Sequence, residues 1–282
     1  SKAPNIFNFL QSSFLGKKFI GFEKPPPLLQ KESLNDWWGG HESDNEIYNT
    51  TVWVIADMFT QYYDVNIGQD VLNLLKKCRV NIKVVSPKSS IVAMISCGLL
   101  NEAKNELKML YSQLENISKN DLIVGIEPSE VLVWRDEALN LIHGKPLNVL
   151  LFEELLLKLD SLEVLPKFNT LNSKVWVHEH CHQKVLAETS NLIKVLALIP
   201  QLQVEIINSG CCGMAGDFGY KNLKISEKIA HNSLNFHMKK IKDQDILIAT
   251  GTSCRRQILD VFKNQAQHLP RLFIEFMVAD SC

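Results

Sequence analysis

The sequence predicts an α/β fold of two duplicated lobes, each a small, mostly parallel sheet flanked by helices. Three observations lead to this prediction. Short hydrophobic runs alternate with helical patterns, most of these runs are apolar throughout, and a set of landmark residues recurs in both halves at similar spacing. Continuously apolar runs are typical of strands covered on both faces, and alternation of strand and helix favours parallel sheets.

Six short runs rich in valine and isoleucine predict the strands. They cover residues 51–56, 81–86 and 121–126 in the first half, and 174–178, 204–208 and 245–250 in the second. Apolar residues at three-to-four spacing between these runs predict helices over 68–78, 98–117 and 225–241.

This pattern divides the chain into three parts. Residues 1–50 form an entry segment or linker, residues 51–170 the first lobe and residues 171–282 the second. In the entry segment Pro25–Pro27 favour extended, polyproline-like backbone, and residues 36–46 are expected to form a loop.

The bulk composition limits the possible functions. The chain has 282 residues, of which 46% are hydrophobic, with 30 basic and 31 acidic side chains and a net charge of −1. It carries no block of lysine and arginine, so nucleic acid is not an expected partner. No apolar run reaches the roughly 18–20 residues of a transmembrane segment, and no signal peptide is apparent.

The cysteines favour a reduced setting. There are seven, an odd number, without the even spacing of a disulfide framework. We therefore expect a cytoplasmic location, with any membrane association peripheral and through a partner. The chain begins at Ser1 and continues directly into an apolar stretch, so we expect it to be a piece of a longer polypeptide.

An internal repeat places the cysteines at strand ends. In each half a strand is followed by a landmark, by a pair of residues thirty positions later, and by a further landmark forty or forty-two positions after that. The landmarks are Phe59, Ser89, Ser90 and Glu130 in the first half, and Cys181, Cys211, Cys212 and Cys254 in the second. Because sites in parallel sheets form at the carboxyl ends of strands, we expect the four thiols to meet there. The first half carries no thiols at the matching positions.

Four thiols from separate loops indicate a soft metal centre. Gly210 and Gly213, on either side of the Cys211–Cys212 pair, allow backbone to approach closely. Zinc and iron–sulfur clusters are both candidates, and adjacent cysteines favour a cluster because neighbouring side chains diverge. Two alternatives remain open. The cysteines are ordinary buried residues, or Cys211 and Cys212 form a strained vicinal disulfide.

Histidine and arginine surround these cysteines in the sequence. His178, His180 and His182 would share one face if the segment stayed extended, with Cys181 on the other. They could be hydrogen-bonded loop residues, bind a metal or substrate carboxylate, move protons, or contact a ligand sulfur. Arg255 follows Cys254 and could offset the charge of thiolates, or simply be solvated at a helix start.

The motifs HEHCHQK (178–184), SGCCGMAGDFGY (209–220) and ATGTSCRRQI (249–258) resemble the CCG, or cysteine-rich, domain family. This family includes subunits of heterodisulfide reductase, the iron–sulfur subunits of glycolate oxidase and of anaerobic glycerol-3-phosphate dehydrogenase, and lactate-utilisation proteins. A narrower resemblance is to the C-terminal part of large FAD-linked oxidases, and it extends through EPSEVLVWRDE (127–137) and the entry segment.

The resemblance implies an electron-transfer module of a flavoprotein that acts on 2-hydroxy acids such as D-lactate, glycolate or D-2-hydroxyglutarate. It implies a [4Fe–4S] cluster, or zinc, on Cys181, Cys211, Cys212 and Cys254. FAD would belong to another domain of the parent protein, and the partners would be that flavin domain or subunit and an electron acceptor. This chain would not be catalytic alone.

The sequence departs from the family pattern at two places. Ser89, Ser90 and Glu130 replace cysteines of the first repeat, so we expect that half to be metal-free. Cys254 is a single cysteine where heterodisulfide reductases have Cys-x-x-Cys, and this difference favours zinc or a simpler cluster over the cluster of those enzymes. The alternative function is a structural or docking domain, without redox activity, that binds zinc or no metal.

Overall fold

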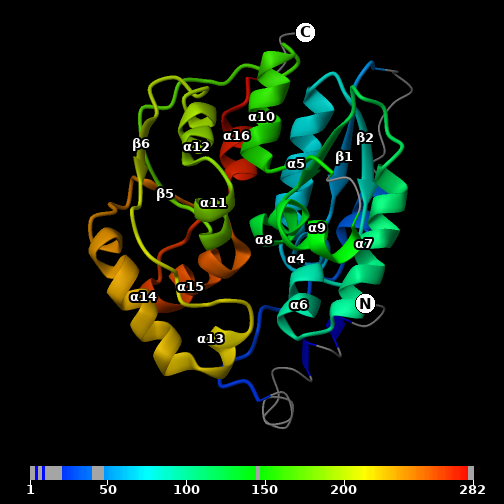
Figure 1. Cartoon of the computed structure of the whole chain (residues 1–282). Coiled ribbons are helices and arrows are strands. Elements are labelled where there is room, and N and C mark those ends of the chain that lie inside the picture. The colour runs from blue at the N-terminus through cyan, green and yellow to red at the C-terminus, as the bar shows by residue number, and fades with distance from the viewer. Residues whose placement is uncertain (1–3, 6–7, 10–20, 40–47, 144–146, 279–282) are drawn as a thin grey trace.

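Two parallel sheets, each flanked by helices, make up the protein (Figure 1). The structure is a computed structural model that describes residues 4–5, 8–9, 21–39, 48–143 and 147–278. The predicted fold class is therefore confirmed. Among the described residues, we find no helix that combines the length and hydrophobicity needed to span a membrane.

The first sheet contains four strands in the order β2-β1-β3-β4, all parallel. Their bounds are Thr51–Ile55 for β1, Asn81–Val85 for β2, Leu122–Gly125 for β3 and Val149–Leu150 for β4. The first three match the predicted runs. The sequence does not predict the edge strand β4, because two residues are too few to give a periodic signal.

The second sheet contains three parallel strands in the order β6-β5-β7. Their bounds are Lys174–His178 for β5, Gln203–Ile206 for β6 and Ile246–Ala249 for β7. In both sheets the strand that comes first in the sequence is central, the second pairs on one side and the third on the other. This shared order is what a duplicated unit predicts.

A tryptophan–aspartate contact recurs in both sheets. The indole Nε1 of Trp53, in β1, donates to Asp121 over 3.4 Å, and that of Trp176, in β5, donates to Asp245 over 2.9 Å. Each aspartate stands just before the third strand of its sheet. The contact aligns the two central strands, so Ile55, two residues after Trp53, corresponds to His178, two residues after Trp176. This register places Met58, rather than the predicted Phe59, opposite Cys181.

Helices connect successive strands. In the first half they are α3 (Leu34–Gly39), α4 (Met58–Tyr62), α5 (Val65–Lys77), α6 (Ile91–Ser96), α7 (Leu100–Leu114), α8 (Pro128–Leu132), a 3₁₀ turn (Val133–Arg135), α9 (Glu137–Ile142) and α10 (Phe152–Ser161). In the second half they are α11 (Cys181–Leu186), α12 (Thr189–Leu196), α13 (Phe218–Lys221), α14 (Leu223–Met238), α15 (Thr252–Phe262) and α16 (Leu269–Phe276).

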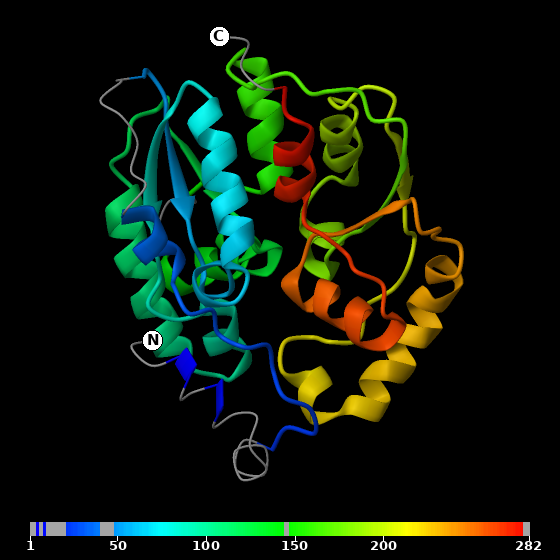
Figure 2. The same ribbon diagram turned by 180° about the vertical axis from the view of Figure 1, so that it is seen from behind.

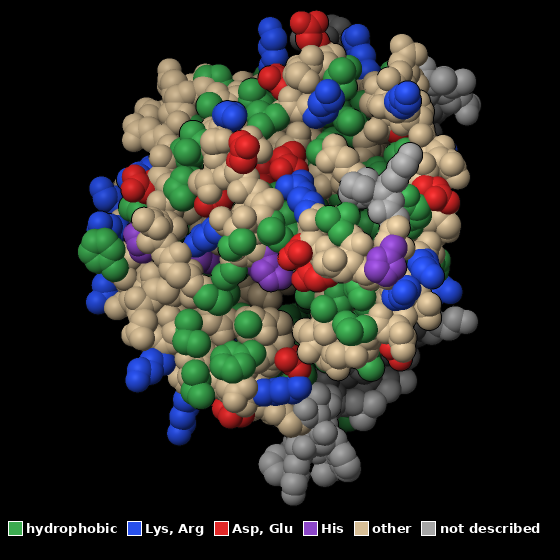
Figure 3. Space-filling view, viewed as in Figure 1, with side chains coloured by type: hydrophobic (Ala, Val, Ile, Leu, Met, Phe, Trp, Pro, Cys, Tyr) green, Lys and Arg blue, Asp and Glu red, His purple; other side chains and the backbone are tan. Residues whose placement is uncertain are grey.

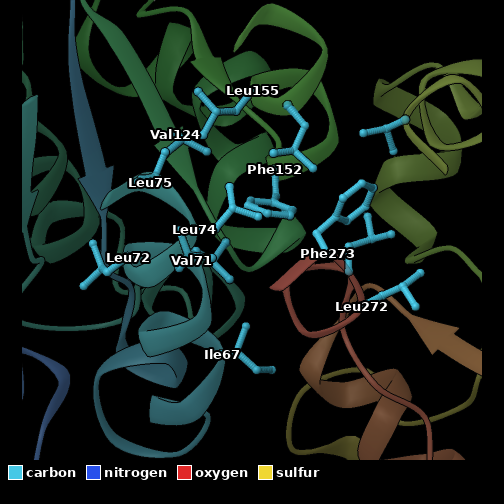
Figure 4. Packing of buried hydrophobic residues seen from close by; sticks show 14 of the residues in the cluster. Ile67, Val71, Leu72, Leu74, Leu75, Val124, Phe152, Leu155, Leu272 and Phe273 are labelled. Carbon is cyan, nitrogen blue, oxygen red and sulfur yellow. The ribbon is translucent and has the colours of Figure 1, made fainter. Parts of the chain in front are cut away.

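The main hydrophobic core lies between the two sheets and joins the halves. Helices α5, α10, α12 and α16 occupy the middle of the molecule in both views (Figures 1 and 2). Figure 4 shows Leu74 of α5 beside Phe152 of α10, with Phe273 of α16 on the side of the second half. All three are fully or almost fully buried within one cluster that also contains Val124 and Val177 from the two sheets. Burial of each such side chain stabilises the fold by about 1.5–3 kcal/mol, so this core opposes separation of the halves.

Each half also buries an outer core of its own. Helices α6 and α7 cover the far face of the first sheet, where Leu107 and Leu110 pack with Ile123. Helix α14 covers the far face of the second sheet, where Leu234 packs with Trp176. Both sheets are therefore covered on both faces, which explains why their strands are apolar throughout.

The entry segment contacts both halves. In Figure 2 the chain following residue 20 passes beneath the second half before it reaches the first. The backbone N–H of Glu23 donates to Tyr220 over 2.7 Å, Lys24 pairs with Asp260, and the N–H of Gln30 donates to Tyr62 over 2.7 Å. The segment therefore ties the α13 region of the second half to the first half. The domain boundaries themselves stay a prediction.

The prediction of a loop over residues 36–46 is wrong for residues 36–39. Residues 36–39 belong to α3, whose Leu34 and Trp38 are buried against the core, and residues 40–46 lie outside the described part. The hydroxyl of Ser33 accepts a hydrogen bond from the N–H of Asp36 over 3.2 Å, which starts the helix. The tryptophan pair and the following glycine suggest a loop, whereas the one-turn spacing of Leu34 and Trp38 favours a helix.

Candidate metal centre

The loops after β5, β6 and β7 bring four cysteines together. Cys181 begins α11, Cys211 and Cys212 follow β6, and Cys254 lies in the first turn of α15. Contacts between sulfur atoms link Cys181 to Cys211, Cys211 to Cys212, and Cys212 to Cys254. All four are free thiols, so Cys211 and Cys212 are not joined as a disulfide. We call these four residues the thiol cluster.

The thiol cluster runs from the interior to the surface. Cys212 and Cys254 are 2% and 1% exposed, Cys181 is half-buried, and Cys211 is exposed. The inner sulfurs are therefore shielded from water, while the outer ones face a region that solvent or another protein can reach. Figure 3 shows acidic, basic and apolar side chains mixed over one face of the molecule, with a small hollow near its middle.

Hydrogen bonds between the thiols favour two of them as thiolates. The Cys181 thiol donates to Cys211, and together with Cys212 it lowers the pKa of Cys211 to about 2. Contacts with Cys212, and then with the His178 side chain, hold the pKa of Cys254 well below its usual range, against the opposing effect of burial. The pKa values of the donors Cys181 and Cys212 are raised. Because a metal binds thiolate rather than thiol, Cys211 and Cys254 are the two sulfurs that their surroundings favour for metal binding.

His178 joins the thiol cluster. The side chain is fully buried at the end of β5, and one of its ring nitrogens lies within 4.8 Å of the sulfurs of Cys212 and Cys254. The three histidines do not share one extended face opposite Cys181, because the strand ends at His178 and helix α11 begins at Cys181. That turn brings His178 to the same side as the sulfurs.

His180 and His182 lie at the start of α11. The His180 side chain caps the helix by accepting from the N–H of His182 over 3.3 Å, and the two rings meet edge to face at 5.2 Å. His182 is exposed, whereas His180 is half-buried. The side chain of His180 thus caps the helix. A role of His180 and His182 in cofactor binding stays a prediction.

Two glycines are required by the backbone around the thiol cluster. Gly213 has φ of +90°, and a Cβ there would lie 2.5 Å from the Ser226 carbonyl oxygen. At Gly251, which precedes the Cys254 turn, a Cβ would lie 2.5 Å from the His180 ring. Gly210, in contrast, would place a Cβ only in ordinary contact with its surroundings, at 3.6 Å. The sequence prediction thus included Gly213 for the right reason, overestimated Gly210 and missed Gly251.

Arg255 binds across to the first half. Its Nη2 donates to Asp64 over 2.6 Å, and its Nη1 donates to the carbonyl oxygens of Ala249 and Thr250, each over 3.0 Å. The Asp64 carboxylate also accepts from the Thr252 hydroxyl over 2.6 Å. The guanidinium therefore fixes the turn that carries Cys254. Nothing in the sequence near Asp64 could have indicated this pairing, because it depends on how the halves dock.

A second set of contacts fixes helix α11. The Thr250 hydroxyl donates to Gln183 over 2.6 Å and accepts from the N–H of His180 over 3.0 Å. The amide of Gln183 in turn donates to the Glu153 carboxylate at the start of α10. Burial raises the pKa of Glu153 to about 7. Cys181 thus sits on a short helix that is tied to both β7 and the first half.

The corresponding place in the first half presents oxygen atoms instead of sulfur. Ser90 donates to the buried Glu130 carboxyl, and the N–H of Ile91 donates to the same carboxyl over 3.2 Å. Ser89 is exposed, and Phe59 is half-buried. Burial raises the pKa of Glu130 to about 8 and that of Asp57 nearby to about 6. That the first half binds no metal stays a prediction.

Comparisons with known proteins give relatives among oxidoreductases. The chain is 29% identical over 300 residues to D-2-hydroxyglutarate dehydrogenase of Escherichia coli strain K12, covering 98% of this chain and 29% of that protein. It is 27% identical over 300 residues to D-2-hydroxyglutarate dehydrogenase of Pantoea ananatis, again covering 98% and 29%. It is 24% identical over 255 residues to one subunit of the anaerobic glycerol-3-phosphate dehydrogenase of Escherichia coli strain K12, covering 85% and 62%.

The chain therefore spans less than a third of the length of the D-2-hydroxyglutarate dehydrogenases that it matches. No family model matches it. Among solved structures, Picrophilus torridus aspartate racemase superimposes with a TM-score of 0.34 at 13% identity, covering 80% of this chain and 91% of that one. A superposition this loose supports no conclusion. The relatives thus include one subunit of a multi-subunit dehydrogenase, and they match this chain over most of its length.

Proposed function

We propose that this chain is the electron-transfer module of an FAD-linked oxidoreductase that acts on a 2-hydroxy acid, with a metal centre on the thiol cluster. The observation that carries the proposal is the meeting of four thiols from three loops at one end of the second sheet. The names of the relatives support the class of reaction and the presence of a partner. The motifs of the CCG domain family support the same assignment.

The donor set fits a soft metal centre. Cys181, Cys211, Cys212 and Cys254 supply the sulfur ligands that iron–sulfur clusters and zinc both accept. An iron–sulfur cluster would supply one-electron transfer when bound. A [4Fe–4S] cluster would bind each of the four sulfurs to a different iron atom, and the sulfurs would have to move apart to admit it.

The residues around the cysteines would control such a centre. Burial of Cys212 and Cys254 keeps water from its inner side, while exposed Cys211 leaves an outer side open to an electron donor or acceptor. The contacts of Arg255 and Gln183 hold two of the ligand loops against the first half. Flavin and substrate would lie on other parts of the parent protein, and the chain would not be catalytic alone.

Metal analysis of anaerobically prepared protein tests the proposal. We expect iron and acid-labile sulfide in the protein, and a broad absorbance near roughly 400 nm from thiolate-to-iron charge transfer that bleaches on reduction. Substitution of Cys254 by alanine should remove both. Protein that takes up neither iron nor sulfide during anaerobic reconstitution would contradict the electron-transfer role.

The second candidate is a structural or docking domain that binds zinc. The observation that favours it is the compact buried group of His178, Cys212 and Cys254, whose donor atoms all lie within 4.8 Å of one another. Such a set resembles the closed sites of structural zinc. Colourless protein with about one zinc per chain, unaffected by reductant, would favour this candidate over the first.

A further inference from the structure

The imidazole of His178 has one nitrogen with no partner among the described residues. The side chain is fully buried, and its Nδ1 lies 3.1 Å from the Ser209 hydroxyl. Within the described part of the chain its Nε2 has no partner at ordinary hydrogen-bond distance, although the ring is close enough to Cys254 to add to the effect of Cys212 in lowering the pKa of that thiol. A buried polar atom left without a partner costs about 1–3 kcal/mol, so such atoms are uncommon and call for a physical reason.

The contact with Ser209 favours one tautomer of the imidazole ring. The Ser209 hydroxyl is placed to donate to the carbonyl oxygen of Gly210, at 3.4 Å, so its oxygen is left to accept from Nδ1–H of His178. In that tautomer the lone pair is on Nε2. This is how metal-binding histidines are commonly prepared, with the remote nitrogen hydrogen-bonded and the near one free to coordinate.

The imidazole ring is close to two buried sulfurs. A ring nitrogen of His178 and the sulfurs of Cys212 and Cys254 lie within 4.8 Å of one another. Around a single tetrahedral metal with bonds of about 2.0–2.3 Å, such atoms would be about 3.5–4 Å apart. A small inward movement of the three side chains would therefore bring them to bonding distance.

The repeat supplies an independent observation. The tryptophan–aspartate contacts align His178 with Ile55 of the first half, where no thiols converge among the described residues. Ile55 is buried and apolar, as expected for a strand residue under a helix. A buried imidazole replaces it only in the half that carries the thiol cluster. The histidine thus occurs in the half that has the four cysteines, and an apolar residue occurs in the half that lacks them. Core packing alone would not require a histidine at this position.

We infer that His178 is a direct metal ligand through Nε2, so that the centre is a mixed thiolate–imidazole site. His178, Cys212 and Cys254 form its buried side, and one outer cysteine completes the four ligand positions of a tetrahedral metal or of a [4Fe–4S] cluster. This inference deepens the proposed function and depends on its metal centre. The motif around Cys254 contains a single cysteine, and the imidazole of His178 supplies the second donor that this motif lacks.

A neutral imidazole in place of a thiolate changes the properties of the centre. It lowers the net negative charge at the metal, and histidine ligation raises the reduction potential of iron–sulfur centres. It also introduces a directly bonded nitrogen, which spectroscopy detects independently of any activity. The inference can therefore be tested without the rest of the parent protein.

The experiment loads the whole chain with Zn²⁺ alone and, separately, reconstitutes it with iron and sulfide under anaerobic conditions. X-ray absorption of the zinc form should show sulfur and imidazole scattering in the wild type. Pulsed EPR of the reduced iron form should show a strongly coupled nitrogen that changes when histidine is labelled with ¹⁵N. Both signatures should disappear in His178→Ala.

Three further variants separate ligation from a structural role. His231→Ala changes an exposed histidine outside the predicted site and should keep the nitrogen signature. His178→Cys should restore metal binding with a shell of sulfur only. Ser209→Ala keeps the imidazole but removes the hydrogen bond at its Nδ1. It should weaken metal binding by about 10–100-fold, as loss of outer hydrogen bonds to metal ligands does.

The outcomes distinguish this inference from the function on which it depends. A wild-type shell of sulfur only, or an unchanged nitrogen signature in His178→Ala, would overturn His178 ligation and leave the metal centre standing. If the wild type binds neither zinc nor iron, both the centre and the inference fail. If His178→Ala does not fold, His178→Cys and Ser209→Ala decide the question, since each retains a polar side chain in the cluster.

Discussion

Asp64 of the first half and Arg255 of the second form an ion pair at 2.6 Å, directly beside the turn that carries Cys254. The same carboxylate accepts from the Thr252 hydroxyl, and the N–H of Thr252 donates to Glu127 of the first half over 2.8 Å. The half without thiols at the matching positions therefore positions one cysteine of the half that has them. This relationship gives the first half a physical role in the proposed metal centre, to which it contributes no sulfur.

Substitution of Asp64 by alanine should weaken both the fold and the metal site. It removes two charge-assisted contacts that are largely shielded from water, so we expect a loss of about 1–3 kcal/mol in the free energy of unfolding. Metal affinity should also fall, since the Cys254 turn is less restrained. Denaturant unfolding and a metal-binding titration measure the two effects.

The exposed ion pair of Lys221 with Asp217 provides the control. Both side chains are about half exposed, and the pair lies within one helical turn. Lys221→Ala should leave both stability and metal affinity close to those of the wild type, because solvent screens an exposed ion pair. Equal effects of Asp64→Ala and Lys221→Ala would show that the contact between the halves has no special role.

Single cysteine substitutions should divide the cysteines into two groups. Cys254→Ala and Cys181→Ala should abolish stable metal binding, because each removes a sulfur of the thiol cluster. Cys97→Ser changes an exposed cysteine outside the cluster, and Ser89→Ala changes an exposed residue in the first half. Metal content after gel filtration should remain at the wild-type level in the last two. Retention of metal in both Cys254→Ala and Cys181→Ala would refute the ligand assignment.

The Glu130 carboxyl should make stability depend on pH. Burial raises its pKa from 4.5 to about 8, so between these values the folded state binds a proton that the unfolded state does not. Stability should therefore decrease as the pH rises from about 4.5 through 8, at about 1.4 kcal/mol per pH unit for this one group. Unfolding measured across this range should show a smaller slope in Glu130→Gln, which cannot ionise. An identical slope in the wild type and in this variant would contradict the prediction.

Two neighbouring glycines should respond differently to alanine. Gly213→Ala forces a Cβ into a position 2.5 Å from the Ser226 carbonyl at φ of +90°, and should cost roughly 1–3 kcal/mol. Gly210→Ala meets only an ordinary contact and should change stability by less than about 0.5 kcal/mol. Thermal unfolding of the two metal-free variants compares them. Similar midpoints would indicate that the loop adapts and that its backbone is not fixed at Gly213.

Much of the fold could be predicted from the sequence because the strands carry a strong local signal. Six of the seven strands in the described residues match continuous runs of apolar residues, since helices cover both faces of each sheet. The two residues of β4 are too few to be recognised. The aromatic pair and terminal glycine of α3 favour a loop, and only the spacing of Leu34 and Trp38 indicates the helix.

Of the candidate site, the grouping of the four cysteines could be predicted, because they are the residues that the internal repeat identifies. Spacing from each strand end placed the four cysteines at matching loops, and the structure brings their sulfurs together. The environment of His178 could not be predicted, because it depends on where β5 ends and α11 begins. The partners of Arg255 depend on the docking of the two halves, which is fixed by side chains far apart in sequence.

Thiol reactivity of the metal-loaded protein, measured before and after removal of the metal by a chelator, tests the central claim most directly. If Cys181, Cys211, Cys212 and Cys254 hold one centre, Cys181 and Cys211 should become reactive once the metal is removed, whereas Cys212 and Cys254 stay buried until the protein unfolds. Identical numbers of reactive thiols in the two states, under conditions in which the metal is shown to be bound, would place the metal elsewhere and contradict the account.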